Sequence, residues 1–180
     1  VYFNDVKITC NSLDKYSKLF SNYMNEVVYE AIDDRWEIAI GVNNTTEFGH
    51  VSFVNGIQTL KGGEHVNNVS KIIAKKVQSY VKTKGYKRKK NIKVTQQHLR
   101  DNMFIILRSV IENPSFNAQI KEFLTTPPKK FGSKFTISDK TIEKLAKTSL
   151  VVSPTKMNVF YILASHPLKD GALGNPIDVS

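Results

Sequence analysis

Lysine is the residue type whose spacing in this chain most directly suggests chemistry. Residues 71–93 read KIIAKKVQSYVKTKGYKRKKNIK and contain ten Lys or Arg and no Asp or Glu. The whole chain of 180 residues has a formal net charge of +10, so this one segment equals the entire excess. A localised basic segment is the electrostatic footprint of a protein that binds a polyanion.

The densest part of this segment, residues 82–90, has the composition of a loop that contacts phosphates. Lysine and arginine neutralise phosphates without reading bases, which gives salt-sensitive and sequence-independent affinity. The candidate phosphate-contacting residues are Lys82, Lys84, Lys87, Arg88, Lys89 and Lys90. A solvated surface loop, or a run similar to a nuclear-localisation signal, is the alternative interpretation.

The run TLKGG at residues 59–63 also has suitable residue types, because it lies directly before a predicted helix. Glycines at a helix N-terminus are typical of turns that cradle phosphate. The run is not a Walker motif, however, and we interpret the glycine pair as serving tight turn geometry. Lys61 is then a candidate for a contact with another domain.

No metal centre or catalytic constellation is recognisable. The histidines show no metal-ligand spacing, and the single cysteine, Cys10, excludes an internal disulfide, so no zinc site is predicted. The longest apolar run, VFYILA at residues 159–164, is too short to cross a bilayer. The four histidines are His50, His65, His98 and His166.

Hydrophobic periodicity predicts the elements that position these residues. Alternation predicts a strand over residues 36–42 and, after a turn-rich stretch, a return strand of the same hairpin over 50–55. Other segments predict a strand over 2–9, a helix that Ser12 caps and that reaches residue 24, a helix over 64–81, a strand over 103–111 and a helix capped by Ser138. The order β-α-β-β-α-β-α predicts an α+β fold, a mainly antiparallel sheet with helices on one face.

Two motifs resemble a known family. Residues 51–66 read VSFVNGIQTLKGGEHV, and residues 111–132 read IENPSFNAQIKEFLTTPPKKFG. Together with the basic stretch between them, they resemble the transducer domain of eukaryotic-type type IIA DNA topoisomerases. The resemblance covers about residues 1–151 and implies a fold like domain 2 of ribosomal protein S5. Residues 152–180, beyond the resemblance, are expected to be a divergent linker or tail.

The resemblance assigns a role to the loop that follows the strand over 103–111. In the family this loop reaches into the neighbouring ATPase domain, where its lysine touches the γ-phosphate of bound ATP. Carried over by position, Lys121 is the ATP-binding lysine and Gln119 is its polar partner. Ile120 stands where the family usually has threonine. Without the motif, Lys121 would be one more solvated loop lysine, and the resemblance also implies that the basic loop faces DNA.

The resemblance therefore implies one part of an ATP-dependent type II DNA topoisomerase, a part that couples ATP binding and hydrolysis to movement of the DNA gate. Signatures of the ATPase site, of the Mg²⁺ site and of the DNA-cleaving tyrosine do not occur in the sequence. We therefore expect this fragment alone to be inactive, and ATP and Mg²⁺ to be held mainly by other domains of the parent chain.

The implied partners are DNA, the ATPase and cleavage-core domains of the same chain, and a second copy in a homodimer. The sequence begins at Val1 within a strand-like run, which favours a piece of a longer protein. Many Lys and Asn residues suggest an AT-rich genome, such as that of a large DNA virus. The expected location is intracellular: the nucleus if the source is cellular, and the host cytoplasm or nucleus if it is viral. The alternative interpretations are a stand-alone nucleic-acid-binding module of S5-like fold and a transducer-like domain of a related ATPase.

Overall fold

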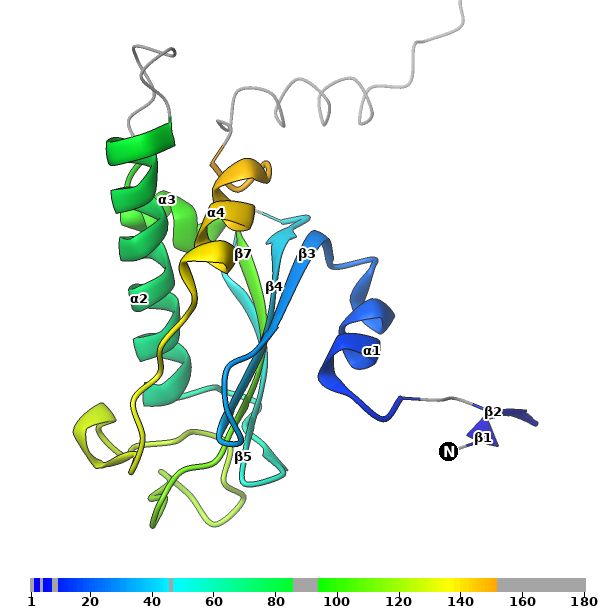
Figure 1. The fold of residues 1–180 in the computed structure, drawn as a ribbon. Helices are drawn as coiled ribbons and strands as arrows, with labels where there is room; N and C mark the ends of the chain where they lie inside the picture. The colour runs from blue at the N-terminus through cyan, green and yellow to red at the C-terminus, as the bar shows by residue number, and fades with distance from the viewer. Residues whose placement is uncertain (1, 4, 8–9, 46, 86–93, 152–180) are drawn as a thin grey trace, which may run out of the picture.

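The chain is built around a five-stranded sheet. The structure is a computed structural model that describes residues 2–3, 5–7, 10–45, 47–85 and 94–151. The strand order is β3-β4-β7-β5-β6 (Figure 1), and neighbours are antiparallel except for β5 and β7, which run parallel. The strands are β3 (Met24–Ala31), β4 (Trp36–Asn43), β5 (Gly49–Val54), β6 (Ile57–Gln58) and β7 (Met103–Ser109).

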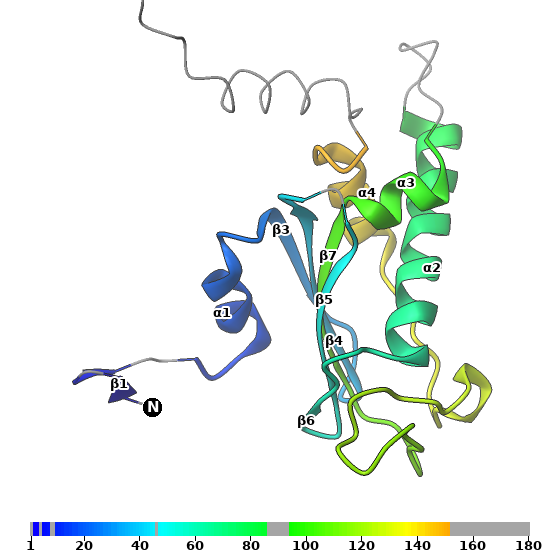
Figure 2. The ribbon, with the colours of Figure 1, turned by 180° about the vertical axis from the view of Figure 1, so that it is seen from behind.

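Three helices cover one face of this sheet (Figures 1 and 2). They are α2 (Glu64–Tyr80), α3 (Gln96–Asp101) and α4 (Asp139–Lys147). The short α1 (Leu13–Ser17), continued by a 3₁₀ turn over Lys18–Phe20, lies against the opposite face. The predicted α+β fold with a mainly antiparallel sheet is confirmed, and α1 adds partial cover to the second face.

The central strand β7 is apolar along almost its whole length because both of its faces are covered. Residues 103–107 are all buried, and Ile105 and Leu107 lie opposite Ile40 and Ile38 of β4. A strand covered on both faces needs no alternation of polar and apolar residues. This explains why the sequence shows β7 as a continuous apolar run.

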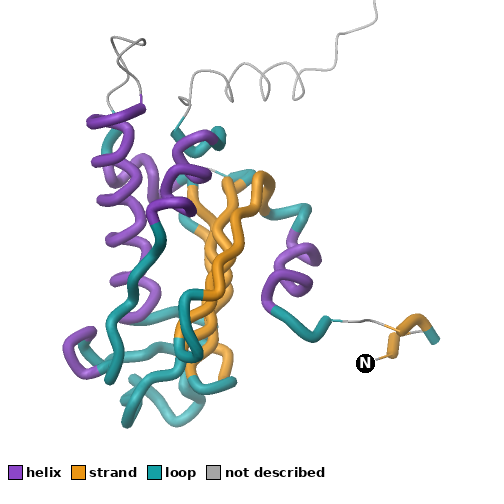
Figure 3. The backbone as a smooth tube through the Cα atoms, in the orientation of Figure 1, coloured by secondary structure: helices purple, strands orange, loops and turns teal. Residues whose placement is uncertain are grey.

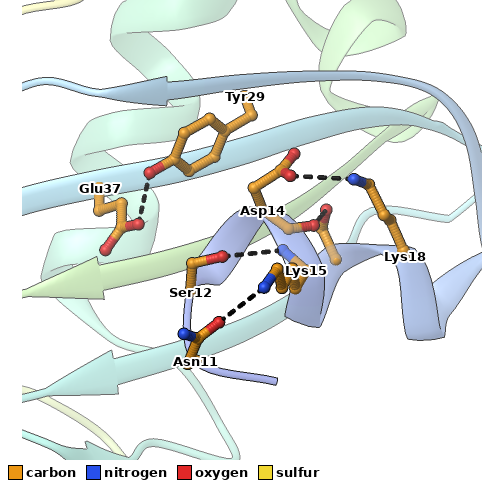
Figure 4. A network of polar contacts seen from close by, with 8 residues as sticks. Asn11, Ser12, Asp14, Lys15, Lys18, Tyr29 and Glu37 are labelled. Atoms are coloured by element: carbon orange, nitrogen blue, oxygen red, sulfur yellow. Dashed lines mark hydrogen bonds and ion pairs between the residues drawn. The ribbon is translucent and has the colours of Figure 1, made fainter. Parts of the chain in front are cut away.

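The predicted helix caps are confirmed, and the helix predicted over residues 64–81 has an apolar face. Val66, Val69, Ile73 and Val77 of α2 are buried against the sheet. The Ser138 hydroxyl accepts a hydrogen bond from the backbone of Thr141 at the start of α4. At the start of α1 the hydroxyl of Ser12 accepts from the backbone N–H of Lys15, and Figure 4 shows this cap beside the hydrogen bond that Tyr29 donates to Glu37.

Residues 131–133, FGS, at the end of the second motif, close the core beside β4. Phe131 follows a 3₁₀ turn over Pro128–Lys130, and its ring centroid lies 5.8 Å from that of Trp36. The indole N–H of Trp36 donates to the hydroxyl of Ser133 over 2.7 Å. A buried indole N–H needs a partner, so Ser133 has a structural role here.

The predicted hairpin over residues 36–55 is wrong. The strands β4 and β5 do not pair, because β7 lies between them and bonds to both. The chain leaves β5 through the tight turn to β6, passes along α2 and α3, and returns as β7. The hairpin was predicted because β4 and β5 are close in sequence. The apolar strand β7 lies between them instead, because the centre of the sheet buries it most completely.

The N-terminal elements also differ from the prediction. The expected strand over residues 2–9 is instead a small antiparallel pair, β1 (Tyr2–Phe3) and β2 (Val6–Lys7). The helix after Ser12 ends well before residue 24, which begins β3, a strand that the sequence did not predict. A bulge between Asn25 and Val28 interrupts the alternation of β3, and Glu26 has a φ of 48°.

Candidate functional site

The two sequence motifs meet at the N-terminal end of α2. Figure 3 shows the loops that leave β5 and β7 gathered at one end of the sheet. There the backbone of Lys61 donates to the carbonyl of Glu122 over 2.8 Å, and Leu124 donates to Gly62 over 3.0 Å. Glu64, the first residue of α2, donates to the carbonyl of Leu124 over 2.9 Å. A short backbone ladder therefore ties the TLKGG turn to the segment that contains the predicted ATP-binding lysine.

The glycine pair allows this close approach. Gly62 and Gly63 have φ angles of 72° and 137°, a region that L-residues with a Cβ rarely adopt. A Cβ on Gly63 would overlap the backbone of Leu124 and lie 2.8 Å from its Cα. The interpretation of the glycine pair as a turn of special geometry is confirmed. The N–H group of Glu64, the first of α2, is bonded to the carbonyl of Leu124 and is therefore not free to bind a phosphate.

Segment 115–125 forms a narrow loop whose tip projects from this anchor. Thr125 donates to the carbonyl of Ser115 over 2.9 Å, and Asn117 donates to that of Phe123 over 3.1 Å. The tip is a turn in which the backbone of Lys121 donates to Ala118 over 3.0 Å, with Lys121 itself at a φ of 58°. Gln119 and Ile120 are exposed at this tip, Ile120 to 73%.

The side chain of Lys121 has no anionic partner among the described residues. It is half-buried, and its Nζ lies 6.0 Å from the ring centroid of Phe116, within range of a cation–π contact. The side-chain amide of Gln119 likewise has no hydrogen-bond partner among the residues that the structure describes. The tip thus presents one ammonium group and one amide, both uncommitted, on a loop held by backbone bonds.

Lys61 lies beside this tip and has a partner within the chain. Its Nζ lies 2.7 Å from Oε1 of Glu122, the residue that follows Lys121. The hydrogen bond from Lys61 holds the pKa of Glu122 below its ordinary value. The sequence offered Lys61 for a contact with another domain, and the structure pairs it internally with a carboxylate that the sequence analysis did not single out.

An asparagine turn sets the start of the loop. Asn55 and Gly56, at φ angles of 51° and 82°, form the tight turn between β5 and β6. The Asn55 amide donates to the carbonyl of Ile111 over 3.0 Å, and its oxygen accepts from the backbone of the same residue over 2.9 Å. This two-point contact fixes where the chain leaves β7, so the SFVN and IENP runs are partners in space.

A row of buried polar side chains lies next to the glycine turn. The hydroxyls of Ser52 and Thr59 lie 2.6 Å apart, and the Thr59 hydroxyl lies 3.3 Å from Nε2 of His65 in the first turn of α2. Burial, with a smaller contribution from nearby His50, lowers the pKa of His65 to about 3. The sequence analysis did not find this role, although His65 lies four residues before Val69 on the apolar face of α2.

The basic loop begins at the opposite end of α2. A π-helical turn over Val81–Gly85 continues the helix, with Lys82 exposed and Lys84 within the turn. Lys87, Arg88, Lys89 and Lys90 lie outside the described residues. The Lys121 loop and the described start of the basic loop, with Lys82 and Lys84, therefore lie at the two ends of one helix.

Two classes of feature are not found within the described ranges. No group of three or more His, Cys, Asp or Glu side chains there is arranged to hold a metal ion. None of the described helices is long and apolar enough to cross a membrane.

The sequence matches known proteins over most of its length. Residues 8–155 match the family model described as DNA gyrase B. The chain is 38% identical to DNA topoisomerase 2 of Meyerozyma guilliermondii over 172 residues, which cover 83% of this chain and 12% of that protein. It is 32% identical to DNA topoisomerase 2 of Acanthamoeba polyphaga mimivirus over 155 residues, again 83% of this chain and 12% of the relative. The chain thus spans about a tenth of the length of these relatives.

Solved structures with sequence identities in the same range have the same fold. The ATPase region of Saccharomyces cerevisiae topoisomerase II superimposes with a TM-score of 0.70 and 34% identity, over 89% of this chain and 39% of that one. The ATPase and transducer domains of DNA topoisomerase II from Balamuthia mandrillaris give a TM-score of 0.67 and 32% identity, over 85% and 37% of the two chains. From the match of the family model and from these relatives, the chain belongs to the DNA gyrase B family and is homologous to the eukaryotic DNA topoisomerases 2.

Proposed function

We propose that residues 1–151 are the transducer domain of an ATP-dependent type II DNA topoisomerase, followed by a linker or tail over residues 152–180. In this proposal the domain couples ATP binding and hydrolysis in a neighbouring ATPase domain to movement of the DNA gate. The parent enzyme passes one duplex through another, relaxes supercoils and acts as a homodimer. The fragment alone has no complete active site and is inactive.

The observation that carries the proposal is the uncommitted ammonium group of Lys121 at the tip of an anchored loop. A lysine paired with a carboxylate would have to break that pair before binding phosphate, whereas Lys121 lies near the ring of Phe116 and has no carboxylate partner among the described residues. Gln119 adds an exposed amide at the same tip. These groups fit the terminal phosphate of ATP bound by another domain, because an ammonium and an amide N–H both donate to phosphate oxygens.

Such a contact would work as a releasable link between domains. A charge-assisted bond from Lys121 to the terminal phosphate holds this domain in one orientation relative to the ATPase domain. When that phosphate leaves, the ammonium loses its partner and the orientation is freed. Mg²⁺ and most contacts to ATP belong to the ATPase domain, so this chain contributes a sensor of the phosphate.

The basic loop is the proposed DNA contact. Lys82 and Lys84 lead into it from the end of α2, and the remaining basic residues follow within residues 86–93. The loop also favours a second candidate function, a stand-alone nucleic-acid-binding module. That candidate accounts for the charge of the loop, but it gives no reason for an uncommitted lysine on a loop that is anchored at the far end of α2.

The test is Lys121→Ala in the full-length parent enzyme, with Lys129→Ala as the matched control. Lys129 is an exposed loop lysine at the same end of the sheet. We expect Lys121→Ala to lower ATP turnover and strand passage roughly tenfold or more, the effect of one charge-assisted hydrogen bond. Thermal unfolding of both variants should match that of the parent, since neither side chain lies in the buried core. Parental ATP turnover in a folded Lys121→Ala enzyme would refute the phosphate contact.

A further inference from the structure

The ion pair between Lys61 and Glu122 lies directly beside the proposed phosphate-contacting residue. Two bonds join these residues, one between backbones at 2.8 Å and one between side chains at 2.7 Å. The side chain of Glu122 is only 16% exposed, whereas that of Lys61 is 65% exposed. The Glu122 carboxylate also lies 3.5 Å from the amide of Asn117, on the other limb of the loop. Glu122 thus connects both limbs of the loop to the turn before α2.

The negative charge of Glu122 would oppose phosphate binding at the tip of the loop, and Lys61 neutralises that charge. A carboxylate one residue from Lys121 can attract the ammonium group of Lys121, and it repels any phosphate that approaches the tip. Paired with Lys61, the carboxylate is neutralised and is held against the turn. The ammonium of Lys121 then stays free for an anion.

We propose that Lys61 is a positioning residue for the nucleotide contact, because it holds Glu122 and thereby fixes the loop and keeps Lys121 uncommitted. The inference rests on the proposed function of Lys121, and it assigns Lys61 no contact with ATP. The pair itself contributes little to global stability, because an ion pair with one exposed partner is worth little in water.

The experiment is a charge cycle in the full-length parent enzyme. The variants are Lys61→Met, Glu122→Gln, the double variant with both changes, and the swap Lys61→Glu with Glu122→Lys; Lys129→Met is the matched control and Lys121→Ala the reference. Each is measured for KM and kcat of ATP hydrolysis, for thermal unfolding, and for hydrogen–deuterium exchange of residues 115–126. The exchange readout is independent of nucleotide.

We expect Lys61→Met to raise KM for ATP roughly three- to tenfold, with faster exchange in residues 115–126 and unchanged thermal unfolding. Adding Glu122→Gln should recover part of this effect, because no unpaired carboxylate remains beside Lys121. The swap should recover more, because it restores an ion pair of opposite direction. A lysine that acts through anything other than the charge of Glu122 would give no such recovery.

Three results would overturn the inference. A Lys61→Met enzyme with the KM and exchange of Lys129→Met would show that the pair positions nothing. A defect in Lys61→Met that neither Glu122→Gln nor the swap relieves would mean that Lys61 contacts the nucleotide or another domain directly. Parental turnover in Lys121→Ala would refute the proposed function itself, and with it the nucleotide role of Lys61, while exchange in residues 115–126 would still show whether the pair holds the loop.

Discussion

The two ends of α2 present lysine side chains in different ways. At its N-terminal end a single lysine, Lys121, is presented by a loop that backbone bonds tie to a glycine turn. At its C-terminal end lysines and an arginine are concentrated in sequence, and Lys82 is simply exposed. The 17 residues of α2 separate the two ends by about 25 Å.

This difference separates two cases: one in which the position of a single charge matters, and one in which only the number of charges matters. Under the proposed function, a single terminal phosphate requires a donor at a defined point, and the special backbone geometry lies at that end of α2. The backbone of duplex DNA carries phosphates along its whole length, so a basic segment can act by neutralising several of them in no fixed arrangement. Substitutions at the two ends should therefore fail in different ways.

The largest expected effect is at the glycine turn. Gly63→Ala places a methyl group against the backbone of Leu124 and forces a φ of 137° on a residue with a Cβ. We expect a decrease of roughly 3 kcal/mol or more in the free energy of unfolding of this chain, measured by urea denaturation.

Gly56→Asn is the matched control for that change. Gly56 also has a positive φ, of 82°, but a Cβ there meets nothing within 4 Å, and asparagine tolerates such turns. We expect a change below about 1 kcal/mol. Equal decreases in the two variants would contradict the assignment of the sensitivity of Gly63 to the overlap with Leu124.

Neutralising the basic loop should change DNA binding and leave the fold intact. In a variant with Lys87, Arg88, Lys89 and Lys90 all changed to Gln, we expect the slope of log affinity against log salt to fall by about 3 to 4, roughly one for each phosphate that the loop no longer neutralises. The measurement is a DNA titration of this chain across a salt series, and Lys129→Gln is the control. An unchanged slope would remove the loop from the DNA interface.

The smallest expected effect is a pH dependence of the free energy of unfolding that comes from His65, at the N-terminal end of α2. The pKa of His65 is about 3 in the folded chain, against an ordinary 6.5 when unfolded, so below pH 6.5 the unfolded chain binds a proton that the folded chain does not. His65 therefore leaves stability intact above pH 6.5 and lowers it as the pH falls toward 3. We expect a decrease of about 2 kcal/mol in the free energy of unfolding between pH 6.5 and pH 5.

Urea denaturation at a series of pH values measures this decrease, and His65→Gln is the comparison. The variant keeps a polar contact for Thr59 but has no proton to bind in this range. Its stability should vary less with pH than that of the parent. Identical pH profiles would assign the acid sensitivity to other groups.

The sequence predicted the elements that are locally periodic. The apolar face of α2 and the continuous apolar run of β7 were both recognised, and the serine caps of α1 and α4 were found from residue type alone. These features depend on neighbours within a few positions. The strand β3 was missed for the same reason, because its bulge removes the local alternation that marks a strand.

The site was only half predictable for a related reason. The resemblance of the motifs pointed to Lys121 and Gln119, and their roles remain predictions. The partners of the loop come from distant positions: Lys61 and Glu122 are separated by 61 residues, and Asn55 and Ile111 by 56. Single-sequence patterns contain no information about such pairs, whose formation depends on where β7 enters the sheet.

The insertion of β7 between β4 and β5 also fixes an order of events during synthesis. Both flanking strands leave the ribosome before β7, and they do not pair with each other in the folded chain, so the edge that each offers to β7 stays open until residue 109 has been made. Open apolar edges are where nascent chains aggregate. The growing chain therefore passes through a vulnerable interval of more than 50 residues, from the end of β5 to the end of β7, and β7 closes both edges at once.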